Sequence, residues 1–202
     1  IKTTPPGRGS RLLRVSDDEP LWERYGRPVD GARLLVTGPF TEDDLGVACS
    51  HSKVGAVELL LNHLVDGPGE YVVVDMTAGA DAFASGLFTR FDRTVLVVEP
   101  TRKSVSVYHQ YRSYAAEHQV EVSVVGNKVV DAGDAAFLQD EIGADLIGCV
   151  GLSPAIRAAE RGEPFVLGDL AQDDHRTLAA IRAALDGTPR DWPRYTRQAV
   201  EF

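Results

Sequence analysis

The chain has 202 residues, of which 44% are hydrophobic and 25% charged, and its formal net charge is −9 at pH 7. This length is typical of one domain with a substantial core, and the negative balance argues against nucleic acid or an anionic membrane surface as the main partner. The two cysteines do not make a disulfide framework, and no stretch has the length and apolarity of a membrane span, so we expect a cytoplasmic protein.

The first third of the chain is predicted to contain one strand and one helix. Residues 1–31 hold many prolines and glycines and are expected to be an irregular N-terminal segment. Residues 33–37 are predicted to form a short buried strand. From residue 54 to residue 65, apolar side chains recur at offsets of three and four, which predicts a helix.

The stretch Tyr71–Asp81 carries the first candidate site. Its four β-favouring residues predict a buried parallel strand, which places Asp75 at the carboxyl end, where open α/β sheets bind ligands. Asp75 and Gly79 suit a magnesium-phosphate site, because the carboxylate can hold the water shell of Mg²⁺ and glycine lets the backbone approach an anion. The alternative is a strand that ends in a turn-forming aspartate.

Strands and helices alternate along the rest of the chain with short connections, which predicts an α/β doubly wound fold with a mainly parallel sheet. Residues 1–202 are therefore expected to form a single nucleotide-binding-type domain. The predicted elements are a short helix over 82–91, strands over 94–99, 120–125 and 145–150, helices over 101–117, 134–142, 154–161 and 173–185, and a loosely ordered C-terminal tail over 187–202.

Four loops follow the predicted strands and should meet at one edge of the sheet. A nucleotide across that edge would have its phosphates near Asp75 and Gly79 and its base near Asn127. An asparagine amide offers both a donor and an acceptor, which matches an edge of adenine. Asn127 and Lys128 are equally compatible with a plain turn.

The sequence Cys49-x-His51 is a candidate metal motif, because thiolate and neutral imidazole both bind transition metals. Two ligands do not complete a tetrahedral site, so a symmetric dimer or a partner would supply the others. The alternative is a buried cysteine near a helix start with a capping histidine. Cys149 lies within a strand pattern and is expected in the core.

Together these motifs resemble the deviant P-loop ATPases of the MinD/ParA type over residues 33–168. Within that class the chain resembles the maturation ATPases that help to load nickel into carbon monoxide dehydrogenase. The matching motifs are Val73-Val-Asp-Met-Thr-Ala-Gly79 as switch II, Leu96-Val-Val-Glu-Pro-Thr-Arg-Lys-Ser-Val105, Val124-Val-Gly-Asn-Lys-Val129, and Ser153-Pro-Ala-Ile-Arg-Ala-Ala-Glu-Arg-Gly162.

The resemblance implies an ATP- and Mg²⁺-dependent switch that forms a homodimer around nucleotide and acts on a client metalloenzyme or another protein partner. It gives Asp75 and Gly79 a catalytic role at the phosphates, and it places Asn127, Lys128, Ser153 and Pro154 at the nucleotide. Members of the group often carry Cys-x-Cys where this chain has Cys49-Ser-His51, which implies a zinc or nickel site.

The phosphate-binding loop of this class is not part of the sequence. The chain begins at Ile1 and its only methionine is Met76, so we expect a piece of a longer ATPase that would not hydrolyse ATP alone. The alternative is a non-catalytic relative without a P-loop that serves as a binding or regulatory module.

Overall fold

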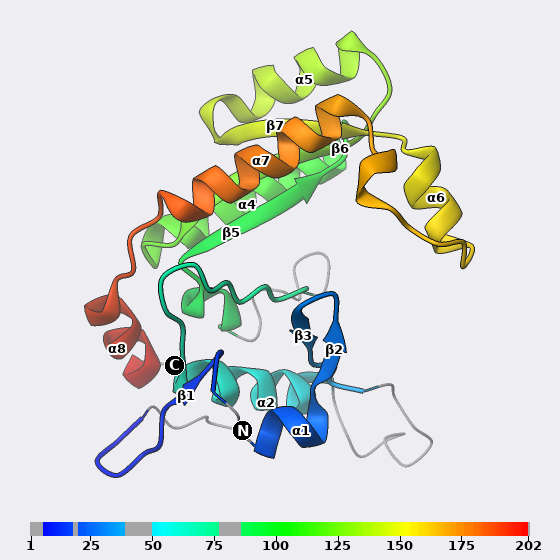
Figure 1. The fold of residues 1–202 in the computed structure, drawn as a ribbon. Coiled ribbons are helices and arrows are strands. Elements are labelled where there is room, and N and C mark those ends of the chain that lie inside the picture. Colours follow the sequence, from blue (N-terminus) through cyan, green and yellow to red (C-terminus); the bar gives the residue numbers. More distant parts are fainter. Residues whose placement is uncertain (1–5, 18–19, 39–49, 77–85, 202) are drawn as a thin grey trace. The chain divides into compact units, whose positions relative to one another are not determined.

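The computed structural model describes residues 6–17, 20–38, 50–76 and 86–201 (Figure 1). The chain divides into two compact units, one made of residues 1–90 and 192–202 and the other of residues 91–191. The second unit contains the parallel sheet, and the first contains shorter strands and helices. The expectation that residues 1–202 form a single domain stays a prediction.

The unit of residues 91–191 is a three-stranded parallel sheet with helices between its strands. The strand order is β5-β6-β7. This confirms the predicted α/β class and the three strands expected here. The strands are β5 (Arg93–Val98), β6 (Glu121–Val129) and β7 (Leu146–Gly151), and the helices are α4 (Arg102–Glu117), α5 (Ala132–Ile142), α6 (Pro154–Glu160) and α7 (Gln172–Asp186), with 3₁₀ turns η3 (Gly143–Asp145) and η4 (Leu167–Asp169).

Side-chain contacts assign the helices to the two faces of this sheet. The hydroxyl of Thr94 on β5 lies 2.8 Å from that of Tyr111 on α4. A Cβ added to Gly126 would lie 2.7 Å from Cδ1 of Leu138 on α5, on the same face by strand alternation. Gly148 points to the opposite face, where α7 packs. The sheet is therefore flanked by α4 and α5 on one side and by α7 on the other (Figure 1).

The core of this unit lies mainly between the sheet and α4 and α5. Val124 and Leu138 are fully buried there. Burial raises the pKa of Tyr111 to about 12. Helix α4 begins after Thr101, whose side chain accepts a hydrogen bond from the Ser104 backbone N–H at 3.2 Å.

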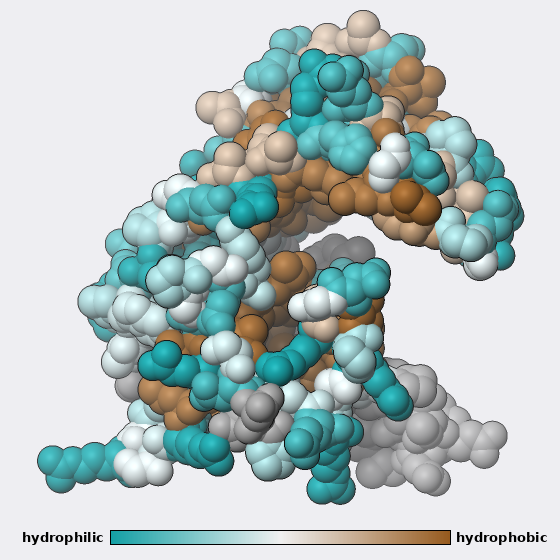
Figure 2. All heavy atoms as spheres, in the orientation of Figure 1, coloured by the Kyte–Doolittle hydropathy of each residue, from teal (hydrophilic) through white to brown (hydrophobic). Residues whose placement is uncertain are grey.

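The α7 side of β5 is less covered, because α7 packs mainly on β7. Val97 points to this side and is 65% exposed. Apolar surface of this unit is visible as brown atoms in Figure 2, and the segment after α6 also exposes apolar residues. They include Phe165, Val166 and Leu167.

The other unit consists of short elements around α2, the predicted helix of residues 54–65. Its helices are α1 (Pro20–Tyr25), α2 (Ser50–His63), η2 (Leu87–Arg90) and α8 (Trp192–Glu201). Strand β1 (Leu13–Arg14) pairs in parallel with β4 (Leu64–Val65), and β2 (Arg27–Val29) pairs antiparallel with β3 (Ala32–Leu34). Glu58 on α2 forms a buried ion pair with Arg90 at 3.2 Å, and burial lowers the pKa of Arg90.

Three predictions about this unit are wrong. Residues 71–76 form no strand, and Val73 is 84% exposed. An apolar run becomes a strand only when a neighbour completes its hydrogen bonds, and no described strand pairs with this one. The buried strand over 33–37 is instead the exposed second strand of a hairpin. The expected loose tail contains helix α8.

The hairpin has a local cause. Asp30 and Gly31 have φ values of 43° and 82° and form the two-residue connection between β2 and β3. Asp-Gly is a preferred sequence for such turns, because both positions need positive φ.

The expected helix over 82–91 is described only from residue 86 onward, where the chain forms the 3₁₀ turn η2.

We predict that Gly148→Ala destabilises the protein by about 1–3 kcal/mol, because overpacking a buried site forces its neighbours to move. The new Cβ would lie 2.6 Å from Oγ1 and 2.9 Å from Cγ2 of the buried Thr177. Denaturant unfolding measures the change. The control is Gly168→Ala, where nothing lies within 4 Å of the new Cβ; equal stability of the two variants would contradict the packing account.

Candidate functional site

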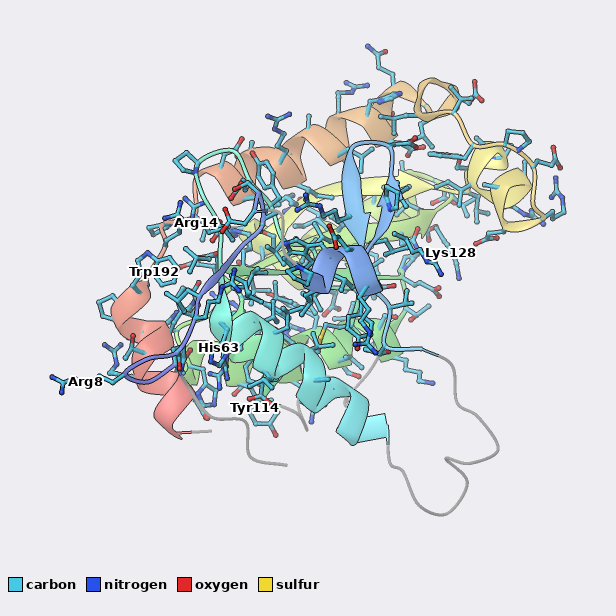
Figure 3. All side chains as sticks on the ribbon, turned by 60° about the horizontal axis from the view of Figure 1, so that its bottom comes forward. Arg8, Arg14, His63, Tyr114, Lys128 and Trp192 are labelled. Atoms are coloured by element: carbon cyan, nitrogen blue, oxygen red, sulfur yellow. The ribbon has the colours of Figure 1, made fainter. Side chains whose placement is uncertain are left out.

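The candidate site is the edge of the sheet at which β5, β6 and β7 end. Because the three strands are parallel, their carboxyl ends lie at this one edge. The structure therefore brings together two of the predicted segments, Asn127–Lys128 at the end of β6 and Ser153–Pro154 after β7. Glu99, the residue after β5, reaches the same edge. Lys128 is labelled in Figure 3, where its side chain extends from the sheet.

The end of β6 contains a β-bulge at Asn127 and Lys128. Gly126 pairs with Cys149 and Val129 with Gly151, so β6 has one more residue than β7 between these pairs. Lys128 has a φ of 57°, in the left-handed region that is uncommon for a residue other than glycine. Its backbone N–H donates to Oδ1 of Asn127 at 3.0 Å. This hydrogen bond fixes the orientation of the Asn127 carboxamide.

Lys128 also links the ends of two strands. Its Nζ donates to Oε1 of Glu99 at 2.5 Å, and both side chains are about half exposed. The hydrogen bond and the negative charge of Glu99 raise the pKa of Lys128, with a smaller contribution from Glu160. The lysine is therefore charged at neutral pH and held by an acidic partner.

Ser153 and Pro154 begin helix α6, as predicted. The Ser153 side chain accepts a hydrogen bond from the Ile156 backbone N–H at 3.3 Å, and Pro154 occupies the first turn, where no backbone donor is required. Ser153 is only 9% exposed. Its hydroxyl is therefore used to start the helix, and the apolar ring of Pro154 lies in the first turn.

Two residues of α7 hold the end of β7 in place, and sequence analysis missed both. Oδ1 of the buried Asp174 accepts a hydrogen bond from the Gly151 N–H at 3.3 Å, and the Thr177 hydroxyl donates to the Cys149 carbonyl at 2.8 Å. They lie three residues apart on one side of the helix. Polar residues within the inward-facing stripe of an amphipathic helix are the signal that would have indicated them.

The other predicted site residues belong to the unit of residues 1–90 and 192–202. Asp75 lies in the exposed segment 71–76. Gly79 and Cys49 fall outside the described residues, and His51 lies in α2 with a side chain that is also outside them. In the described part of the chain, no three His, Cys, Asp or Glu side chains are grouped as a metal site. The roles predicted for Asp75, Gly79, Cys49 and His51 stay predictions.

A parallel sheet flanked by helices, with polar loops at its carboxyl edge, is the arrangement of P-loop NTPase-like α/β proteins. The chain is similar to the carbon monoxide dehydrogenase accessory protein CooC of Rhodospirillum rubrum, with 29% identity over 156 residues, 75% of this chain and 59% of CooC. The predicted resemblance to the deviant P-loop ATPases near the carbon monoxide dehydrogenase maturation group is thereby confirmed.

The chain is also similar to an uncharacterized ATP-binding protein of Methanocaldococcus jannaschii, with 27% identity over 173 residues, 82% of this chain and 66% of the relative. It thus spans 59% and 66% of the length of these two curated relatives, less than two thirds of each. No protein-family model matches the chain. None of the helices in its described part has the length and apolarity to cross a membrane.

We predict that Glu99→Gln lowers the pKa of Lys128 toward its ordinary value of 10.5, because the carboxylate charge that favours the ammonium form is lost. Titration of the lysine side-chain carbon signals by NMR measures the shift. Glu163→Gln is the control, since Glu163 pairs with Arg161 in an equally exposed ion pair. An unchanged Lys128 pKa in Glu99→Gln would refute the pairing.

Proposed function

We propose that the chain is part of an ATP-dependent switch ATPase with a role in metallocofactor maturation. The observation that carries the proposal is the convergence of Asn127–Lys128 and Ser153–Pro154 at one edge of a parallel sheet. It is supported by the similarity of the chain to a carbon monoxide dehydrogenase accessory protein and to an ATP-binding protein. In this proposal the unit of residues 91–191 supplies the base side of an ATP site.

The donor set at this edge fits a purine base. Oδ1 of Asn127 is bonded to Lys128, while its Nδ2 has no hydrogen bond within the part of the chain that the structure describes. An amide N–H₂ can donate to a ring nitrogen of adenine. Pro154 offers an apolar surface at the same edge of the sheet. Lys128 is engaged by Glu99, so we assign it to the support of Asn127 rather than to the phosphates.

The phosphates would be held elsewhere in the protein. We assign Asp75 and Gly79 to the side of the γ-phosphate, where Mg²⁺ when bound neutralises charge that develops on the phosphoryl oxygens. Asp75 lies in the exposed segment 71–76, which has no regular structure in this chain. Such a segment is suited to change its conformation with the nucleotide state, as switch segments do.

We predict that Asn127→Ala weakens ATP binding about three- to tenfold in the protein expressed from its complete reading frame, because one hydrogen bond to the base is lost. Calorimetric titration with ATP and Mg²⁺ measures the dissociation constant. Gln119→Ala is the matched control, because it removes an amide side chain from the opposite end of β6, before its first residue Glu121.

Two outcomes would count against the proposal. Equal weakening in both variants would show that the amide at the carboxyl edge has no special part in binding. Absence of ATP binding in the wild-type protein would instead favour the non-catalytic alternative, a relative that retains the fold as a binding or regulatory module.

We also propose that Cys49 and His51 bind zinc or nickel at the interface of a homodimer and thereby serve a client metalloenzyme. Helix α2 begins at Ser50, the residue between them in the sequence. Thiolate and imidazole are suitable ligands for either metal, and a second copy would complete four ligands.

The metal proposal predicts one metal ion per two chains in the wild-type protein and a large loss of metal in Cys49→Ser, because the thiolate supplies part of the affinity. Elemental analysis after gel filtration measures both quantities. Cys149→Ser is the control, since Cys149 lies in β7 and its thiol pKa is raised by burial. Equal metal content in wild type and Cys49→Ser would exclude Cys49 as a ligand.

A further inference from the structure

Strand β7 lies at an edge of the parallel sheet, because β6 is its only strand neighbour within the described residues. An edge strand leaves a row of backbone donors and acceptors without a strand partner. Near the end of β7, side chains of α7 take the place of that partner. The Thr177 hydroxyl donates to the Cys149 carbonyl at 2.8 Å, and Oδ1 of Asp174 accepts from the Gly151 N–H at 3.3 Å.

The two bonded backbone groups are the pair that a further parallel strand would use. In a parallel ladder, one residue of the neighbouring strand donates its N–H to the carbonyl of residue i−1 and accepts the N–H of residue i+1. Cys149 and Gly151 flank Val150 in this way. A hydroxyl and a carboxylate three residues apart on α7 therefore supply the donor and the acceptor, and the end of β7 is closed by a helix.

Asp174 closes this edge with a buried carboxylate. The residue is 5% exposed, and no Lys, Arg or His in the described ranges forms an ion pair with it. Burying a carboxylate is unfavourable unless polar groups compensate. Asp174 lies in the first turn of α7, where the helix dipole favours a negative charge, and the N-cap residue Ala171 makes no side-chain hydrogen bond. The carboxylate thus joins the start of α7 to the end of β7.

The hydrogen bond at Gly151 lies directly before the loop that carries Ser153 and Pro154. This loop and the helix after it are held by few buried side chains. Leu152 is 54% exposed, and Ser153 is the only buried residue in the range 152–160. The direction in which the chain leaves the sheet is therefore set at Gly151, two residues before Ser153.

We propose that Asp174 is a positioning residue for the nucleotide. By accepting the Gly151 N–H, its carboxylate holds the Ser153–Pro154 loop in the conformation that binds ATP. This role rests on the proposed ATP site and adds to it a residue of α7 that lies outside the loops of the sheet edge. Thr177 has a different part, because it bonds the Cys149 carbonyl within the strand and stabilises the packing of α7 without directing the loop.

The role is tested by ATP titration in a calorimeter, with the protein expressed from its complete reading frame. Asp174→Ala removes the acceptor, so ATP should bind about three- to tenfold more weakly, because the hydrogen bond no longer favours the binding conformation of the loop. Asp174→Leu also removes the acceptor, without leaving a cavity, and should have the same effect. Asp174→Asn keeps a side-chain oxygen that accepts hydrogen bonds and should restore most of the affinity.

Two control variants separate positioning from packing and from charge. Thr177→Val removes the neighbouring hydrogen bond to β7 and should bind ATP as the wild type does. Asp173→Ala removes the same charge from an exposed position in the first turn of α7 and should also leave binding unchanged. Denaturant unfolding should show lower stability in both Thr177→Val and Asp174→Ala, because each leaves a backbone group without its partner. Amide hydrogen exchange should show lost protection at Gly151 in Asp174→Ala alone.

The outcomes distinguish this role from the proposed function. If the wild type binds no ATP, the proposed function fails, and the role of Asp174 fails with it. If the wild type binds ATP and the Asp174→Ala and Asp174→Leu variants bind it equally well, Asp174 does not position the loop. If Thr177→Val or Asp173→Ala weakens binding as much as Asp174→Ala, or if Asp174→Asn does not restore it, the effect comes from packing or charge, and the proposal is wrong.

Discussion

The candidate site depends on the parallel pairing of β6 with both of its neighbours. Six consecutive pairs join β5 to β6, and further pairs join β6 to β7. Parallel strands need a crossover helix between them, so each carboxyl end leads into a loop and then into α4, α5 or α6. Polar side chains from segments far apart in the sequence are thereby placed at one edge of the sheet.

Close packing around β6 and β7 fixes the backbone at this edge of the sheet. Gly126 and Gly148 lie where any larger side chain would overlap Leu138, Cys149 or Thr177. Both ends of the bulge are therefore held by the core, and the left-handed conformation at Lys128 is maintained by the surrounding sheet. The half-exposed ion pair with Glu99 is of a kind that usually contributes little to stability. Its effect here is to hold the Lys128 side chain in place at the ends of β5 and β6.

The elements that sequence analysis predicted well are those whose cause is local. The valine-rich runs of β5 and β6 and the capping side chain of Thr101 act within a few residues. The Asp30–Gly31 turn is equally local, and its Asp-Gly signal was overlooked. Residues 71–74 show the limit of such reasoning, because the same apolar pattern as in β5 is not a strand here. Strand formation depends on a partner, which a local pattern does not reveal.

The candidate site was predictable in part for the same reason. The sequence placed Asn127, Ser153 and Pro154 at the ends of strands, and the structure brings these segments to one edge. The ion pair between Lys128 and Glu99 depends on the register of two strands, and the buried contact of Asp174 with Gly151 depends on how α7 packs. A polar residue in the inward-facing stripe of α7 indicates that Asp174 has a buried partner, but no short-range pattern in the sequence identifies the partner in either contact.

The most direct test of the account is to map where ATP acts on the protein by two-dimensional NMR of the backbone and side-chain amides. The account predicts that ATP shifts the Asn127 side-chain N–H₂ signals and the backbone signals of Lys128 and Leu152–Ser153 more than those at the opposite end of β6. Shifts confined to other parts of the chain, with these signals unchanged, would contradict a base site at the carboxyl edge of the sheet.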